Sequence, residues 1–219
     1  MKHTAISPSI ILLDWDGTLL NSYESDTRAY LSMFRALKIE FTQAEIERHY
    51  SPNWHRVYEA AKIPKAHWTK ADRLWRRAYA SENPALLPGA RAVLRQLARK
   101  YRLGIVTGGS KPRVRKQIRF FEFHNHFSVC VYSEDTLKKK PHPAPLELAL
   151  RRLKARAEEC VYVGDAPEDI EMARRVGAHA VGVLGPFPTA QSIRAAKPDV
   201  LLASIRELPA YLKTLHLLS

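Results

Sequence analysis

The sequence has few cysteines and no long apolar run, and both absences narrow the classes of protein to which it can belong. Only two cysteines occur among 219 residues. Cys130 and Cys160 both fall in apolar, strand-like stretches, so we expect buried, inert thiols, and neither a disulfide nor a metal ligand. No stretch of about 18 apolar residues is present, which excludes a transmembrane helix. The sequence also lacks internal repeats and low-complexity tracts.

The first apolar stretch of the chain is too short for a secretory signal. Lys2 precedes it, but Asp14 and Asp16 interrupt it before it reaches the length of a signal peptide's hydrophobic region. We therefore expect a cytoplasmic protein. With 219 residues and 46% apolar content, the chain can bury one large core, or one core and a small accessory unit.

Acidic residues are scarce relative to basic ones, and the imbalance is confined to one part of the chain. Of the net charge of +13, residues 87–140 contribute +10, from 13 lysines and arginines against three acidic residues. Such a segment could bind nucleic acid, steer a small anion or keep the protein soluble. It contains no basic motif interleaved with aromatic residues and no known DNA-reading module. A solvated surface or anion steering is therefore favoured over nucleic-acid binding.

The stretch from Ile10 to Leu20 is the most informative in the sequence. A run of branched apolar residues indicates a buried strand, and it stops at two carboxylates, Asp14 and Asp16, followed by Gly17. If this strand belongs to a parallel sheet, its carboxyl end opens on the crevice where such folds bind ligands. Two like charges this close repel each other, and Mg²⁺, which prefers hard oxygen ligands, would relieve the repulsion. The alternative is an ordinary turn, since Asp and Gly are common turn residues.

Residues 21–86 have helical patterns and no strand candidate. A capping-box sequence begins at Thr42, and Pro64 is placed where a first helical turn accepts proline. The stretch 83–89, rich in proline and ending in glycine, then returns the chain to the main body. We therefore predict a helical insert over residues 21–86.

Strands and helices alternate from residue 87 to the end, which favours a parallel sheet with right-handed crossovers. The expected strands are residues 103–107, 128–132, 160–163, 180–183 and 200–202, and the expected helices are 90–100, 111–121, 145–154, 170–176 and 205–215. The predicted fold class is α/β, with a Rossmann-like parallel sheet core from residues 1–20 and 87–219 and an inserted all-α domain.

Polar residues also follow other predicted strands, at the edge of the sheet where Asp14 is expected. Thr107, Gly108 and Gly109 end one strand, and they offer a hydroxyl and backbone N–H groups of the kind that hold phosphate. Thr107 taken alone could equally be a satisfied strand-end hydroxyl. Lys140 ends a basic run but lies on a loop that three prolines in alternate positions stiffen, which indicates a lysine held in place.

A last strand runs into Gly164 and Asp165, and Asp169 falls in the first turn of the next helix. Acidic residues in a first turn complement the helix dipole, which is a sufficient reason for Glu168 and Asp169 but not for Asp165. Carboxylates, a lysine and a hydroxyl thus stand at four separate strand or loop ends. Together they supply what phosphoryl transfer requires: a nucleophile, an acid, a cation and donors to the phosphoryl oxygens.

These motifs, in this order and at these separations, resemble those of the haloacid dehalogenase superfamily. They are Asp14-Trp15-Asp16-Gly17-Thr18, Thr107-Gly108, Lys140-Pro141 and Gly164-Asp165-x-x-x-Asp169. The resemblance extends from residue 9 to about residue 185, and the phosphoglycolate phosphatase-like hydrolases are closest in appearance. It implies that the insert at 21–86 is a helical cap that closes over the substrate and excludes solvent.

The resemblance also implies a magnesium-dependent phosphatase and a role for each residue. Asp14 would attack phosphorus to form an aspartyl-phosphate, and Asp16 would protonate the leaving oxygen and then activate water. Thr107 and Lys140 would hold phosphoryl oxygens as charge develops. The Mg²⁺ ligands would be Asp14, the backbone carbonyl of Asp16, Asp165 and, nearby, Asp169. The substrate would be a small phosphorylated metabolite.

Specificity is expected from the cap. The loop at 49–56 combines a proline break with polar and aromatic groups, so Asn53 and Arg56 are candidate substrate-binding residues together with Gly108 and Gly109. Arg56 could meet a carboxylate or a second phosphate, or could lie on an exposed helix face. The loop departs from the glycine-containing cap loop expected of a phosphoglycolate phosphatase. Phosphoglycolate, pyrophosphate, a sugar phosphate and a nucleotide all remain open, and the sequence does not predict the oligomeric state.

Two other functions are open at this point. Asp16 disfavours a dehalogenase or a phosphonate hydrolase, which typically lack a carboxylate there. A sugar-phosphate mutase is a closer alternative, but such mutases carry a histidine ten residues beyond the second aspartate, where this sequence has Asp26. A non-catalytic basic binding protein on the same fold is the other alternative, and the intact motifs disfavour it.

Overall fold

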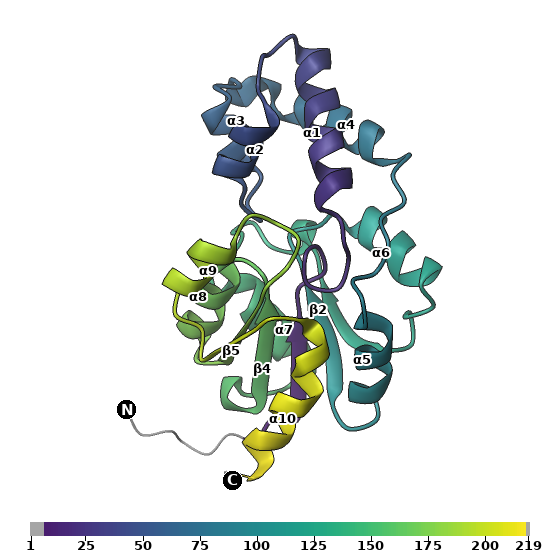
Figure 1. Cartoon of the computed structure of the whole chain (residues 1–219), viewed down its shortest axis with the longest axis vertical. Coiled ribbons are helices and arrows are strands. Elements are labelled where there is room, and N and C mark those ends of the chain that lie inside the picture. The colour runs from purple at the N-terminus through teal and green to yellow at the C-terminus, as the bar shows by residue number, and fades with distance from the viewer. Residues whose placement is uncertain (1–6, 218–219) are drawn as a thin grey trace.

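The computed structural model describes residues 7–217 and contains one six-stranded parallel sheet (Figure 1). Its strand order is β3-β2-β1-β4-β5-β6. The strands are β1 (Ile10–Leu13), β2 (Arg102–Val106), β3 (Phe127–Val131), β4 (Cys160–Gly164), β5 (His179–Val183) and β6 (Val200–Leu202). Because β1 pairs with β2 on one side and with β4 on the other, the topological switch point lies at β1. The predicted Rossmann-like α/β core is confirmed.

Helices cover both faces of the sheet, because successive side chains of a central strand point to opposite faces. One layer consists of α5 (Ala90–Leu97), α6 (Lys111–Phe120) and α10 (Leu208–Leu217), and the other of α7 (Ala144–Leu153), α8 (Pro167–Val176) and α9 (Ala190–Ala195). On β1, Ile11 and Leu13 pack into the first layer, while Ile10 and Leu12 pack into the second. All four side chains are buried, so β1 is the centre of the core.

Four α-helices between β1 and α5 form a separate group at one end of the molecule (Figure 1). They are α1 (Tyr23–Leu37), α2 (Gln43–His49), α3 (His55–Ala60) and α4 (Trp68–Tyr79). This group, which we call the cap helices, has its own buried cluster, in which Phe34 and Tyr58 are among the largest side chains. The capping box of Thr42 and Glu45 starts α2 as predicted. The domain boundaries at residues 21 and 86 stay a prediction, which the separate core supports.

The cap helices join the sheet through two chain segments that lie side by side, residues 19–21 and 85–87. Leu20 and Leu86 form an antiparallel bridge between these segments. One backbone hydrogen bond of 2.8 Å lies on either side of the bridge. The inserted chain therefore leaves and re-enters the core at one place, which we call the stem.

The predicted strands agree with the observed ones to within one residue at each end, whereas the helices differ more. Helix α8 begins at Pro167, three residues earlier than predicted, because proline is accepted at the first position and Asp169 accepts from the N–H of Ala166. Helix α9 is not predicted, since it has six residues and buries only Ile193. The 3₁₀ helices within residues 7–217 are Lys65–His67, Ser133–Asp135, Ala157–Glu159 and Ile205–Glu207.

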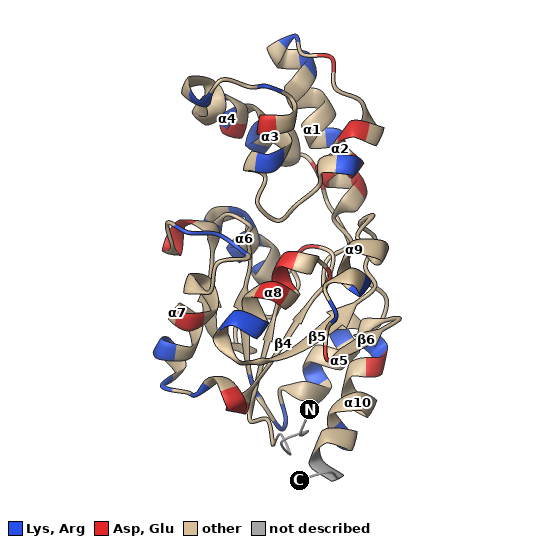
Figure 2. Cartoon of the chain, turned by 90° about the vertical axis from the view of Figure 1, so that its left-hand side faces the viewer, with Lys and Arg blue, Asp and Glu red and all other residues tan. Residues whose placement is uncertain are grey.

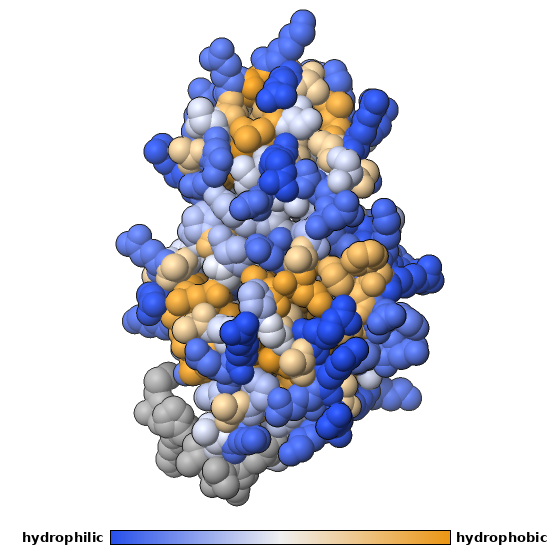
Figure 3. Space-filling model, turned by 45° about the vertical axis from the view of Figure 1, so that its right-hand side comes forward, coloured by the Kyte–Doolittle hydropathy of each residue, from blue (hydrophilic) through white to orange (hydrophobic). Residues whose placement is uncertain are grey.

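Charged residues occur on the cap helices and on the core alike. On the face shown in Figure 2, lysines and arginines lie among acidic residues in both parts. The larger apolar areas in Figure 3 lie over the core, below the cap helices, and polar side chains interrupt them. Among the described residues, no helix combines the length and the apolar character needed to cross a bilayer. The cytoplasmic location stays a prediction.

Candidate active site

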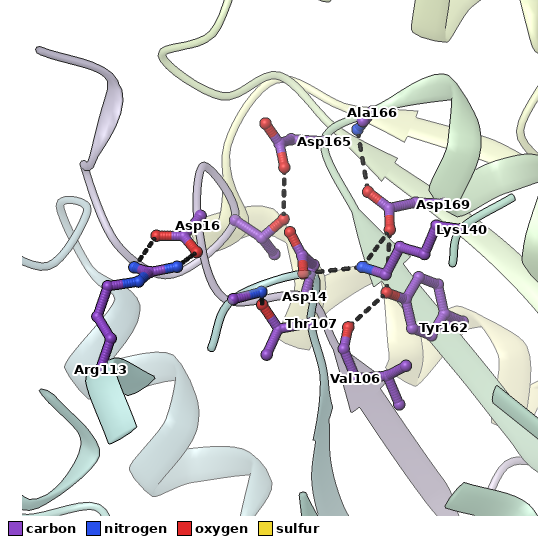
Figure 4. A network of polar contacts seen from close by, with 12 residues as sticks. Asp14, Asp16, Val106, Thr107, Arg113, Lys140, Tyr162, Asp165, Ala166 and Asp169 are labelled. Atoms are coloured by element: carbon purple, nitrogen blue, oxygen red, sulfur yellow. Dashed lines mark hydrogen bonds and ion pairs between the residues drawn. The ribbon is translucent and has the colours of Figure 1, made fainter. Parts of the chain in front are cut away.

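Polar residues that follow three neighbouring strands meet at one edge of the sheet, at the switch point (Figure 4). Asp14 follows β1, Thr107 follows β2 and Asp165 follows β4. Since β1 lies between the other two strands and runs parallel to both, these residues share one edge. Lys140 reaches the same place from the loop before α7, and Asp169 reaches it from the first turn of α8.

Lys140 is the centre of a buried ionic network. Its ammonium group donates to Asp14 Oδ1 at 2.8 Å and to Asp169 Oδ1 at 2.7 Å, and its side chain is 3% exposed. The Tyr162 hydroxyl lies 3.0 Å from both Asp169 Oδ1 and the carbonyl oxygen of Val106. Burial lowers the pKa of Lys140, but the charges and hydrogen bonds of Asp14 and Asp169 raise it by more. The net result is a pKa above that of an ordinary lysine. Lys140 therefore stays charged.

Three buried carboxylates form a candidate metal centre. One oxygen from each of Asp14, Asp165 and Asp169 lies within 4.8 Å of the others. Asp165 Oδ1 accepts from the Thr18 hydroxyl at 3.0 Å, whereas Asp165 Oδ2 is buried with no hydrogen-bond partner among the described residues. An unpartnered buried oxygen within an all-oxygen donor set fits a hard cation such as Mg²⁺.

The electrostatics of these carboxylates also favour a bound cation. Burial raises the pKa of Asp14 to about 7, and the charges of Asp169 and Asp16 contribute to the rise, against the lowering effect of Lys140. Burial, followed by Asp14 and Asp169, raises the pKa of Asp165 well above its ordinary value. One lysine therefore does not compensate the cluster, and a divalent cation would favour the ionised carboxylates.

Both aspartates of the first motif line one cavity, but the Asp16 side chain turns away from the candidate metal centre. Its carboxylate pairs with Arg113 of α6 through two hydrogen bonds of 2.8 and 2.6 Å (Figure 4). The guanidinium group of Arg113 also lies 5.0 Å from the ring centroid of Tyr79 and 5.9 Å from that of Trp75, both on α4. Arg113 therefore connects Asp16 to the cap helices.

A cavity of about 110 Å³ lies between the core and the cap helices. On the core side, the lining residues include Asp14, Asp16, Thr107, Gly108 and Gly109. The Thr107 hydroxyl accepts from the N–H of Gly109 at 2.9 Å. The rest of the wall combines aromatic rings with charged groups, among them Asp26, Asp72, Arg76 and Arg113, and its six rings belong to Tyr30, Tyr50, Trp54, Tyr58, Trp75 and Phe187. The cavity thus has a polar end at the strand termini and an end where most of the aromatic rings, together with Asp26, Asp72 and Arg76, come from the cap helices and the loop between α2 and α3.

The loop between α2 and α3 is in direct contact with the core. A Cβ atom on Gly108 would lie 2.8 Å from the carbonyl oxygen of Pro52, so this approach requires glycine. Beside it, the Ser51 hydroxyl donates to Glu168 Oε1 at 2.6 Å, and both side chains are buried. The cap helices are therefore closed on the core in this arrangement.

Two residues predicted to bind substrate, Asn53 and Arg56, are not among the residues that line the cavity. Arg56 donates to Glu168 Oε1 at 3.1 Å, and its side chain is 55% exposed. Asn53 is half-buried, and its backbone N–H donates to the Ser51 hydroxyl at 3.1 Å. Both residues lie at the contact between the cap loop and the core, and their role in substrate binding stays a prediction.

Sequence reasoning missed Arg113, Glu168 and Asp26. The basic charge of residues 87–140 indicates a solvated surface and does not distinguish Arg113 from its basic neighbours. Its place one turn beyond the Thr107-Gly108-Gly109 motif is a signal that could have found it. The helix dipole alone explains an acidic residue at Glu168, so the sequence does not indicate the contact of this side chain with the cap loop. Asp26 lines the cavity from the first turn of α1, and its place ten residues beyond Asp16, where the mutases carry a histidine, is the signal that could have found it.

The chain matches the family model of the haloacid dehalogenase-like hydrolases over residues 11–183. Phosphoglycolate phosphatase from Yersinia pestis is 34% identical over 124 residues, which cover 56% of this chain and 53% of that enzyme. The chain therefore spans about half the length of the curated relatives that it matches.

CbbY and a bacterial hydrolase are among the solved structures that share the fold. CbbY from Rhodobacter sphaeroides, solved in complex with phosphate, is 25% identical, with a TM-score of 0.79 over 92% of this chain and 96% of that one. A hydrolase from Pseudomonas syringae is 22% identical, with a TM-score of 0.84 over 94% of this chain and 98% of that one, and it supports the fold alone. The family match includes all four motifs, from Asp14 to Asp169, and the chain therefore belongs to the haloacid dehalogenase-like hydrolase family.

Proposed function

We propose that the protein is a magnesium-dependent phosphatase that hydrolyses a small phosphomonoester through an aspartyl-phosphate. The observation that carries this proposal is the buried contact of Asp14 with Lys140, next to Asp165 and Asp169, at the end of the central strand. A carboxylate in this position is a nucleophile that a neighbouring cation orients toward the cavity. Membership of the hydrolase family and the likeness to phosphoglycolate phosphatases support the hydrolysis of a phosphate ester.

In the first half-reaction, an oxygen of Asp14 attacks phosphorus, and the bond between phosphorus and the alcohol oxygen breaks. Asp16, entering this step protonated, gives its proton to the leaving oxygen. Both oxygens of Asp16 accept from Arg113 in the present arrangement, so one of these hydrogen bonds must be released first. The Thr107 hydroxyl and the Lys140 ammonium group donate to the phosphoryl oxygens as they gain charge.

In the second half-reaction, Asp16 accepts a proton from water, and the water oxygen attacks phosphorus. The bond between phosphorus and the Asp14 oxygen breaks, which restores the carboxylate and releases inorganic phosphate. Asp14, Asp165 and Asp169, with the backbone carbonyl of Asp16, would hold Mg²⁺, which supplies positive charge next to the phosphoryl oxygens. The unpartnered Oδ2 of Asp165 is the observation that supports this metal centre.

The inserted residues 21–86 act as a cap that excludes water from the reaction. The close approach of Pro52 to Gly108 and the buried hydrogen bond between Ser51 and Glu168 support this role. Water exclusion strengthens the electrostatic contacts at Asp14 and prevents transfer to bulk solvent in the first half-reaction. We expect the cap to open for substrate entry, because these contacts hold its loop against the core beside the cavity.

Release of inorganic phosphate from a panel of phosphomonoesters tests this function. We expect turnover with Mg²⁺, none with a chelator, and none above background in Asp14→Asn, which keeps the side-chain shape but cannot form the acyl-phosphate. Phosphorus NMR of the products separates a phosphatase from the mutase alternative, which would accumulate an isomerised sugar phosphate. Retention on heparin with a steep salt dependence, and no turnover, would instead favour the basic binding protein. Wild-type activity equal to that of Asp14→Asn would refute the proposal.

A further inference from the structure

The cap end of the cavity contains a carboxyl group with no partner of opposite charge. The Asp26 carboxyl group lines the cavity and makes no hydrogen bond or ion pair with another described residue. Two arginines also line the cavity, but both are engaged. Arg113 is bound by both oxygens of Asp16, and Arg76 lies 3.7 Å from Asp72. When Asp26 is ionised, this end of the cavity therefore has one uncompensated negative charge.

The surroundings of Asp26 make its unpaired charge costly. Burial, followed by the charge of Asp16, raises the pKa of Asp26 to about 8, and Arg113 lowers it only in part. The ionised form therefore requires a cation that the described residues of the cavity do not supply. A positively charged group on the substrate would supply that cation and would keep Asp26 ionised.

Aromatic rings line the same cavity as this carboxyl group. Tyr30 and Tyr58 line the same cavity as Asp26. Burial raises the pKa of both hydroxyls, and the Asp26 charge is among the further causes in both cases. Asp72 fixes part of this wall, because it accepts from Tyr58 at 2.9 Å and from Trp54 at 3.0 Å. Aromatic ring faces combined with a carboxylate are the surroundings in which proteins bind ammonium and quaternary ammonium groups.

The same charges disfavour an ester that carries a second negative group. A carboxylate on the leaving alcohol would face Asp26, and both arginines of the lining are already paired. Arg56, which the sequence predicts could meet such a carboxylate, pairs with Glu168 and lies outside the lining. Phosphoglycolate contains such a carboxylate, so we expect it to be a poor substrate.

On the basis of the proposed phosphatase activity, we propose that the substrate is the phosphomonoester of an amino alcohol, whose ammonium or quaternary ammonium group binds Asp26 within the aromatic wall. The phosphoryl group of such an ester lies at Asp14, at the polar end of the cavity, while the cation lies at the cap end. Asp26 is then a specificity-determining residue that takes no part in the transfer of protons or phosphate.

Steady-state kinetics with matched esters tests this inference. The full chain with Mg²⁺ is assayed with choline phosphate, with the neutral ester in which carbon replaces the choline nitrogen, and with phosphoglycolate. We expect kcat/KM to be about tenfold or more higher for choline phosphate than for the neutral ester of the same shape. Asp26→Asn should bring this ratio close to one. Glu24→Gln removes an exposed acidic group from the same helical turn and should keep the ratio.

Several results would overturn the inference while leaving the phosphatase activity intact. These are equal kcat/KM for choline phosphate and the neutral ester, a preference for phosphoglycolate or for a planar aromatic ester, and a preference for choline phosphate that survives in Asp26→Asn. If no ester is hydrolysed, the proposed phosphatase function is refuted. Calorimetric titration of the wild-type protein then decides whether Asp26 binds the cationic group. Tighter binding of choline phosphate than of the neutral ester would then support the role of Asp26, and equal binding would refute it.

Discussion

Replacement of the proposed nucleophile should stabilise the metal-free protein while abolishing activity. Asp14 is buried beside two other carboxylates, and its pKa rises from 3.8 to about 7. At about 1.4 kcal/mol for each unit of pKa, this difference corresponds to about 4 kcal/mol by which the ionised side chain opposes folding. Asparagine has no charge, and its carbonyl oxygen can still accept from Lys140. We therefore expect Asp14→Asn to have the higher free energy of unfolding.

The pH dependence of this difference has a defined sign. In the unfolded chain Asp14 ionises near pH 3.8, whereas in the native metal-free protein it ionises near pH 7. Its destabilising effect is therefore absent below the lower value, grows as the pH rises, and is complete above the higher one. The advantage of Asp14→Asn should be about 4 kcal/mol at about pH 8 and less than half of that at about pH 5.

Mg²⁺ should offset the advantage of the variant. A cation that binds only the native protein stabilises it by about 2.7 kcal/mol at a hundred times its Kd, and Asp14→Asn lacks one of the carboxylates proposed to hold it. Urea unfolding followed by tryptophan fluorescence, with a chelator and with Mg²⁺, measures both effects, and Glu24→Gln controls for the loss of an exposed charge. If the chelated variant is no more stable than wild type at about pH 8, the ionised Asp14 is compensated in the protein and the reasoning is wrong.

Three further substitutions test other contacts. Gly108→Ala would place a Cβ atom 2.8 Å from the Pro52 carbonyl oxygen. We expect KM to rise about tenfold or more and the cap loop to be cleaved faster in limited proteolysis. Unchanged KM and cleavage rate would contradict a closed cap. Thr18→Val leaves Asp165 Oδ1 without its hydrogen-bond donor. The Mg²⁺ concentration for half-maximal activity should then rise about 10- to 100-fold. An unaltered Mg²⁺ titration would show that Thr18 does not orient Asp165 for the metal. Arg113→Lys cannot form the paired hydrogen bonds of a guanidinium group; kcat should fall and the pH–rate profile should shift, whereas a purely structural role would lower only the melting temperature.

The polar end of the site is predictable because its residues directly follow strands. Asp14, Thr107 and Asp165 each come after an apolar run, and a parallel sheet brings such positions to one edge. Lys140 is predictable for a related reason, since alternate prolines single it out from the two lysines before it. In patterns of this kind, a few neighbouring residues are enough to predict where a strand lies and where it ends. The predicted strands therefore agree closely with the observed ones.

The contacts between the cap and the core could not be predicted in this way. Asp16 and Arg113 are 97 residues apart, and Ser51 and Glu168 are 117 apart, so no periodicity relates them. Their pairing depends on how the cap helices are seated on the sheet, which is set by packing across the whole contact. Asp26 belongs to the same class, because helical periodicity places it in a first turn without saying whether that turn faces water or a cavity.

The stem has a consequence for how a protein of this shape can change. A segment that departs and returns at adjacent points can vary in length or composition without altering the order or the register of any strand. Exchange of residues 22–84 would replace Asp26 and most of the rings that we propose to select the alcohol, yet leave Asp14, Lys140 and Asp165 where they are. Bond cleavage and substrate choice can therefore evolve independently in this chain.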